Sequence, residues 1–250
     1  MFPSIPLKEE ATLERLLRVF ESHEKFSPNK WGNWERIRLD YNKSEIIDLA
    51  SLDKIDEVYL HRNLSVKYSG RFDINWKQSS YFSFEMNKST SQKYWSTFFE
   101  LFDQVAEIVK PRYGVTHVAW EEIIPWTNDR ERLKIWMFYA SDIVPKDYQY
   151  GPHGLGIRTY LGGDILELFG REIFKTIPAI VTEMEWGGIR VDLVDKPWEA
   201  DPELLFDRWL AAMKHLEPAQ VFAVPIFQND CTWVKFSANK VWKEYLERKR

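Results

Sequence analysis

The feature that most constrains the fold is a pair of glycines, Gly187 and Gly188, set between two segments in which apolar and polar residues alternate. The segments read "PAIVTEMEW" before the glycines and "IRVDLV" after them. Such alternation predicts strands with one buried face, and a short connection that contains glycine is typical of a tight hairpin. We therefore expect antiparallel strand pairs in this chain rather than a doubly wound parallel sheet.

A two-residue turn at the glycines would set the register of this hairpin. It pairs Glu185 with Arg190 and places Glu183 opposite Asp192. Two like charges directly opposite each other cost roughly a few tenths of a kcal/mol or more, unless a cation serves both. Two interpretations stay open: Arg190 neutralises the two acids within the chain, or a basic partner does so from outside.

Helices are expected on either side of further strands. Apolar residues recur at helical spacing over about 8–24 and 92–110, and Pro111 ends the second of these helices. Asp164 and Asp201 each precede a helical pattern and are expected to cap it. The predicted fold class is α+β, with a mainly antiparallel sheet flanked by helices.

The chain is long enough to bury a sizeable core, at 250 residues of which 44% are hydrophobic. No low-complexity linker divides it, so we expect a single compact domain over residues 1–250. The order strand, helix, proline, strand occurs around 80–119 and again around 189–227. One interpretation is that the chain contains two similar halves, each with a strand-helix-strand unit. The other is that the order occurs twice without duplication, because it is common in α+β proteins.

The sequence favours a cytoplasmic protein without a membrane partner. Its start, "MFPSIPLKEEATLERLL", has neither the basic nor the apolar region of a secretion signal. No apolar run approaches the roughly 20 residues that span a bilayer. The single cysteine, Cys231, fits a reducing compartment and lies in an apolar strand-like run where it is expected to be packed.

Charge is distributed unevenly along a chain whose net charge is only -4. Between residues 183 and 207 the bases are Arg190 and Lys196, and the acids are Glu183, Glu185, Asp192, Asp195, Glu199, Asp201, Glu203 and Asp207. A nucleic-acid partner needs a broad basic face, so we expect none. An acidic stretch instead suits a basic protein partner.

Trp198 is the aromatic residue at the centre of this acidic stretch. It lies in a loop between Pro197 and Pro202. An aromatic residue surrounded by acids is either an interface anchor or a plug that covers the core from above. The candidate partner-binding residues are Glu183, Glu185, Asp192, Asp195, Trp198, Glu199 and Asp201.

Cofactor and metal motifs are weak in this chain. The glycine run "GPHGLGIRTYLGGD" has Thr159 where the third glycine of a dinucleotide loop should stand, and no Walker loop occurs. The histidines lack metal-binding spacing, and the only local cluster of candidate ligands is His117 with Glu121 and Glu122. We expect no cofactor and no bound metal.

An enzymatic alternative rests on carboxylates near tryptophans. A hydrolase cleft uses paired carboxylates, and the candidates here are Glu121, Glu122, Asp129 and Asp192. No nucleophile motif accompanies them, and no residue is assigned a catalytic role. A hydrolase with paired carboxylates in a tryptophan-lined cleft is therefore the alternative function.

Four segments carry a resemblance to a known group of proteins. They are "FSPNKWG", "PRYGV", "GIRTYLGGDILELFG" and "WGGIRVDLVDKPWEAD". Through them the chain resembles the immunity proteins of bacterial polymorphic-toxin and type VI secretion systems, in particular the immunity 52-like group. The resemblance implies that the chain binds one cognate toxin, with a basic surface, and blocks its active surface without catalysis. An interaction module with no toxin partner is a third hypothesis, and the sequence leaves the oligomeric state open.

Overall fold

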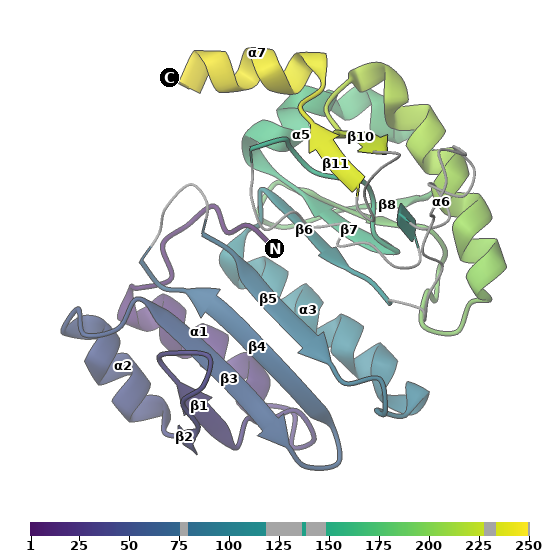
Figure 1. The fold of residues 1–250 in the computed structure, drawn as a ribbon. Coiled ribbons are helices and arrows are strands. Elements are labelled where there is room, and N and C mark those ends of the chain that lie inside the picture. The colour runs from purple at the N-terminus through teal and green to yellow at the C-terminus, as the bar shows by residue number, and fades with distance from the viewer. Residues whose placement is uncertain (76–79, 119–136, 139–148, 228–233, 250) are drawn as a thin grey trace. The chain divides into compact units, whose positions relative to one another are not determined.

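The computed structural model describes residues 1–75, 80–118, 137–138, 149–227 and 234–249 (Figure 1). The chain consists of two compact units, Met1–Pro111 and Arg112–Arg250, called here the N-terminal and C-terminal units. Each contains an antiparallel sheet with helices, which confirms the predicted α+β fold class. The expectation of one domain over residues 1–250 stays a prediction. Of the two segments of the possible repeat, 80–119 spans the boundary between the units and 189–227 lies in the C-terminal unit.

The N-terminal unit is built on a five-stranded sheet in the order β2-β1-β3-β4-β5, in which every neighbouring pair is antiparallel. Its strands are β1 (Lys30–Gly32), β2 (Leu39–Asp40), β3 (Glu57–Asn63), β4 (Lys67–Asp73) and β5 (Phe82–Met86). Its helices are α1 (Glu10–Glu21), α2 (Lys43–Ser51), the short 3₁₀ helix η1 (Gln92–Tyr94) and α3 (Trp95–Val109).

Aromatic side chains join one face of this sheet to α1 and α3, which Figure 1 shows on the same side of it. Phe20 of α1 stacks on Phe84, with the ring centroids 4.5 Å apart. Phe102 of α3 meets the rings of Phe82 and Phe84 edge-on. Gly70 leaves room for this cluster, because a Cβ there would lie 2.2 Å from the Phe84 ring. The opposite face carries exposed polar side chains, among them Ser69, Ser83 and Glu85.

The C-terminal unit contains a four-stranded antiparallel sheet in the order β6-β7-β9-β8 and a separate hairpin of β10 and β11. Its strands are β6 (Tyr113–Thr116), β7 (Arg158–Leu161), β8 (Ile180–Glu183), β9 (Ile189–Asp192), β10 (Val224–Phe227) and β11 (Val234–Ser237). Its α-helices are α5 (Gly163–Phe169), α6 (Pro202–Leu216) and α7 (Lys240–Lys249), with 3₁₀ helices η2 (Arg171–Lys175) and η3 (Glu217–Ala219). All four residues of β7, which lies between β6 and β9, are buried.

The two predicted helix caps have different outcomes. Asp201 caps α6 as predicted, because its side chain accepts hydrogen bonds from the backbone N–H groups of Glu203 and Leu204. The prediction for Asp164 is wrong: the N-cap of α5 is Gly162. Asp164 lies in the first turn of α5, and its carboxylate accepts hydrogen bonds from a residue that is distant in the sequence.

That distant residue is Arg112, a buried arginine at the start of the C-terminal unit. Its Nε and Nη2 donate to the two oxygens of Asp164 at 2.8 and 2.9 Å. The hydroxyl of Tyr245, on α7, donates to Asp164 and accepts from Arg112. Burying a guanidinium is costly unless a carboxylate pairs with it. The ion pair with Arg112 therefore stabilises the fold more than one capping hydrogen bond from Asp164 would.

In the described part of the chain, no helix combines the length and the apolar character needed to cross a membrane.

Candidate functional site

The hairpin of β8 and β9 has a register that differs from the predicted one. Glu183 lies opposite Ile189, and Ile180 lies opposite Asp192. The turn is longer than two residues, since Met184 N–H donates to Gly188 O and Gly187 N–H donates to Met184 O, both at 2.9 Å. The predicted pairing of Glu183 with Asp192 is therefore wrong.

Trp186 gives a physical reason for the longer turn. Its ring lies against the backbone of Gly188, where an added Cβ would be 1.9 Å from the ring. Gly187 adopts a φ of 86°, in the left-handed region that favours glycine. The two glycines thus allow the Trp186 ring to pack against the backbone and allow the chain to reverse its direction.

Asp192 is an interior residue of the C-terminal unit, with 2% of its surface exposed. Its two carboxylate oxygens accept hydrogen bonds from Nε of Arg158 at 2.5 Å and Nε of Arg190 at 2.8 Å. Of the two interpretations of its charge, neutralisation from within the chain is the one that this geometry supports. Its carboxylate lies inside the protein rather than on a surface that a partner could reach.

The role of Arg158 as a partner of Asp192 is what sequence reasoning missed. Arg158 stands in the buried strand β7, directly opposite Asp192 on β9. The signal was present in "GIRTYLGG", where an arginine is the only charged residue of a strand-like run. A charged side chain in such a strand requires a buried counter-charge, and Asp192 provides it.

Trp198 contacts the arginine of this ion pair. The guanidinium carbon of Arg158 lies 5.7 Å from the centroid of the Trp198 ring, within the range of a cation–π contact. The tryptophan is half-buried. The contact with Arg158 agrees with the interpretation of Trp198 as a plug.

The other predicted partner-binding acids are exposed and fall into two groups. Glu183 and Glu185 lie at the turn of the hairpin. Asp195, Glu199 and Asp201 lie beyond the opposite end of β9, in residues 193–201, called here the acidic loop. The strand between the groups is four residues long, which separates them by roughly 10 Å or more.

Ion pairs involving these acids are on the surface. Glu183 is 3.2 Å from Arg171, with 72% of the glutamate side chain exposed. Glu199 is 3.6 Å from Lys196, with 62% of the glutamate side chain exposed. Exposed pairs of this kind contribute about 1 kcal/mol or less, so a partner can displace them at low cost.

His117, the only predicted metal-ligand candidate that lies in the described residues, has a structural role. Its Nδ1 accepts from the backbone N–H of Ile157 at 3.3 Å, and its Nε2 donates to the carbonyl of Phe138 at 2.7 Å. Burial lowers the pKa of His117 to about 4, so the ring is neutral at physiological pH. Its neighbours Glu121 and Glu122 lie outside the described residues, and within those residues no group of three or more potential ligands could hold a metal ion.

The glycine run before β7 is a buried segment whose backbone is used by nearby side chains. Tyr113 donates its hydroxyl to Gly154 O, and Trp209 Nε1 donates to Leu155 O at 2.8 Å. Thr159 Oγ1 accepts from the N–H of Gly156 at 2.9 Å. These contacts tie the run to the core, and the N–H of Gly156 is already occupied rather than open to a phosphate.

The residues of the hydrolase alternative are only partly described. Glu121, Glu122 and Asp129 lie outside the described residues, as does Cys231. Both carboxylate oxygens of Asp192 are already bound by arginines of its own chain. No described contact supports this alternative.

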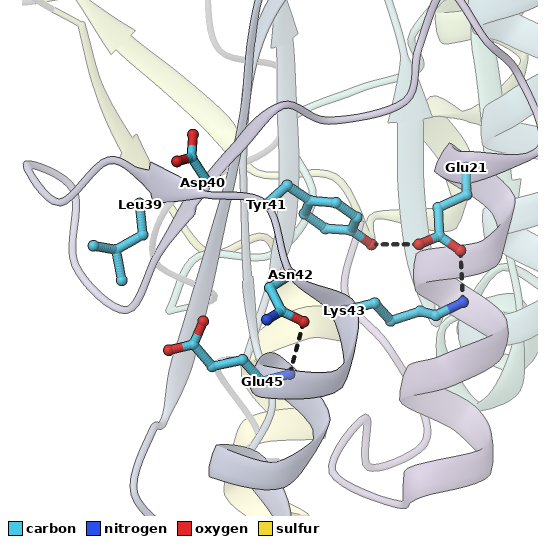
Figure 2. Close-up of a pocket in the computed structure, with 7 residues that line it drawn as sticks. All are labelled: Glu21, Leu39, Asp40, Tyr41, Asn42, Lys43 and Glu45. Atoms are coloured by element: carbon cyan, nitrogen blue, oxygen red, sulfur yellow. Dashed lines mark hydrogen bonds and ion pairs between the residues drawn. The ribbon is translucent and has the colours of Figure 1, made fainter.

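The N-terminal unit has a hollow of about 600 Å³ that sequence reasoning did not predict. Figure 2 shows the residues that line it, Glu21, Leu39, Asp40, Tyr41, Asn42, Lys43 and Glu45. Glu21 accepts from the Tyr41 hydroxyl at 3.1 Å and from Lys43 at 2.7 Å. Acids outnumber the one lysine in this lining, so the hollow suits a positively charged group better than an anion.

Comparison with models of known protein families gives no match for this chain, and comparison with curated proteins gives no match either. Its function is therefore argued from its own residues.

Proposed function

We propose that this chain is a cytoplasmic immunity-type protein that binds a cognate bacterial toxin and blocks its active surface without catalysis. The observation that carries the proposal is the acidic loop. Asp195, Glu199 and Asp201 are exposed there in the same loop as the half-buried Trp198. An aromatic anchor with an acidic rim complements a basic protein surface and accelerates association with it.

An exposed apolar side chain completes this surface. Leu204, in the first turn of α6, has 45% of its surface exposed. Asp201 caps the same helix turn, so the loop and the helix start are held together. The proposed contact surface is thus Asp195, Trp198, Glu199 and Leu204, with Asp192 beneath it as support rather than as a contact.

Co-expression is the direct test of the function. The protein encoded by the adjacent gene is expressed alone and together with this chain, and growth of the bacterial host is followed. We expect that protein to be toxic alone and harmless when the chain is present. Toxicity that the chain does not relieve, or no toxicity at all, would overturn the proposal.

Charge reversal in the acidic loop is expected to weaken toxin binding. Glu199→Lys replaces an exposed acid beside Trp198 and should lower the association rate by about tenfold at low salt, with a smaller effect at high salt. Glu167→Lys makes the same charge change on the exposed surface of α5 and is the matched control. Stopped-flow association at several ionic strengths measures both. Equal effects of the two variants would show that net charge alone, and not the acidic loop, directs binding.

A further inference from the structure

Strand β8 is an edge strand of the four-stranded sheet that the structure describes in the C-terminal unit. The sheet order β6-β7-β9-β8 places β6 and β8 at its two edges. Three of the four residues of β6 are buried, whereas Ile180 and Glu183 of β8 are exposed and the two residues between them are half-buried. Among the strands that the structure describes, β9 alone pairs with β8. An edge of this kind is a template for a further strand.

Observed hydrogen bonds show which backbone groups of β8 face outward. Met184 N–H bonds to Gly188 O next to the turn, and Leu193 N–H bonds to Ile157 O on the other side of β9. In an antiparallel ladder, residues alternate between facing the neighbouring strand and facing away from it. Ile180 and Thr182 therefore direct their N–H and C=O groups toward β9. Val181 and Glu183 direct theirs away from the sheet.

The outward groups of β8 match those of a second copy of the same strand. An antiparallel pairing with its two-fold axis at Thr182 places Val181 of each copy opposite Glu183 of the other. Each such pair exchanges two backbone hydrogen bonds. The axis brings the two Thr182 side chains together, and cross-strand threonine pairs are favourable. On the same face, Ile180 of one copy lies opposite Met184 of the other, which covers an isoleucine that is 44% exposed.

Charge permits this pairing. No carboxylate lies directly opposite another in this register, so the like-charge cost of cross-strand acids does not arise. Glu183, the acid nearest to the axis, already has Arg171 of its own chain 3.2 Å away. The paired surface is therefore close to neutral, in contrast to the acidic loop.

We propose that the chain forms a two-fold symmetric dimer in which β8 pairs antiparallel with β8 of a second copy and joins the two sheets into one. Two four-residue strands bury less area than a standard stable interface, so the dimer is weak and depends on protein concentration. This inference does not rest on the proposed function. The acidic loop follows the far end of β9 and its Trp198 lies over β7, so it stays accessible in the dimer.

Charge pairs at the axis test the symmetry of the dimer. Sedimentation equilibrium of the full chain should show a mass that rises from monomer toward dimer as concentration approaches the millimolar range. Thr182→Lys and Thr182→Glu each place two like charges against each other at the axis and should leave the chain monomeric. An equal mixture of the two variants should dimerise again, because the charges are then opposite. Failure of the mixture to associate would overturn the proposal.

Backbone substitution tests the pairing itself. Val181→Pro removes an N–H group that points away from β9, so the hairpin keeps its internal hydrogen bonds, and proline is tolerated at such edge positions. It should raise the dimer Kd more than about tenfold, because two intermolecular hydrogen bonds are lost. Val181→Thr keeps the N–H group and is the matched control, expected to dimerise like the wild type.

Circular dichroism of each variant shows whether it is folded. A wild type that stays monomeric throughout overturns the proposal, and so does a dimer that persists in folded Val181→Pro. If that variant does not fold, the mixture of Thr182 variants decides.

Discussion

Asp192→Asn is expected to lower the free energy of unfolding by about 3–5 kcal/mol. The substitution keeps the shape of the side chain but removes the negative charge between Arg158 and Arg190. Arg158 has 4% of its side chain exposed, so its guanidinium cannot turn to water when the counter-charge is lost. Urea denaturation at neutral pH, followed by tryptophan fluorescence and circular dichroism, measures the change.

Glu183→Gln is the matched control for this prediction. It removes one carboxylate charge from the same hairpin, at a residue that also pairs with an arginine. Because the pair with Arg171 is exposed to solvent, we expect a loss of about 1 kcal/mol or less. If the two substitutions had similar effects, the buried ion pair would not be a major source of stability.

The hairpin of β8 and β9 shows which parts of the fold could be predicted from the sequence. Alternation and glycines are local signals, and they correctly predicted two antiparallel strands. The register depended on the packing of the Trp186 ring against Gly188, a contact that alternation does not encode. In the observed register Glu183 lies opposite Ile189 rather than opposite Asp192. No pair of opposed acids therefore has to be explained.

The two aspartate caps show the same limit. Asp201 finds its donors two and three residues along the chain, and a local pattern is enough to predict that bond. Asp164 has a similar local pattern but binds Arg112, which is 52 residues away in the sequence. Asp164 thus pairs with a buried arginine from a distant part of the chain instead of capping its own helix.

The candidate site could be predicted in part. Composition alone indicated the exposed acids, since charged residues in a loop after a strand are seldom buried. The exception, Asp192, stands within a strand between two apolar residues, and its position in the interior follows from the pairing of β9 with β7. In the hollow of the N-terminal unit, Glu21 accepts hydrogen bonds from Tyr41 and Lys43, which lie in another part of the chain. No local sequence pattern predicts such a contact.

Stability is also expected to fall in mild acid, by about 3 kcal/mol for each of two buried histidines. Burial lowers the pKa of His61 to about 4 from an ordinary value of 6.5, with a smaller contribution from the charge of Arg38. Burial likewise lowers the pKa of His117 to about 4. Below pH 6.5 the unfolded chain binds protons that the folded chain excludes. Through these two histidines the free energy of unfolding should therefore fall as the pH drops from about 6.5 toward about 4.

Histidine substitutions separate this effect from general acid denaturation. Urea titrations from pH 7.5 to about 4.5 give the slope of stability against pH, which linkage sets at about 1.4 kcal/mol per pH unit for each such histidine. His61→Gln removes one of the two groups and should reduce that slope by about 1.4 kcal/mol per pH unit. His23→Gln removes a half-exposed histidine of the same unit and is expected to leave the slope unchanged. An unaltered slope in His61→Gln would contradict the prediction, because the loss of stability would then come from the carboxylates instead.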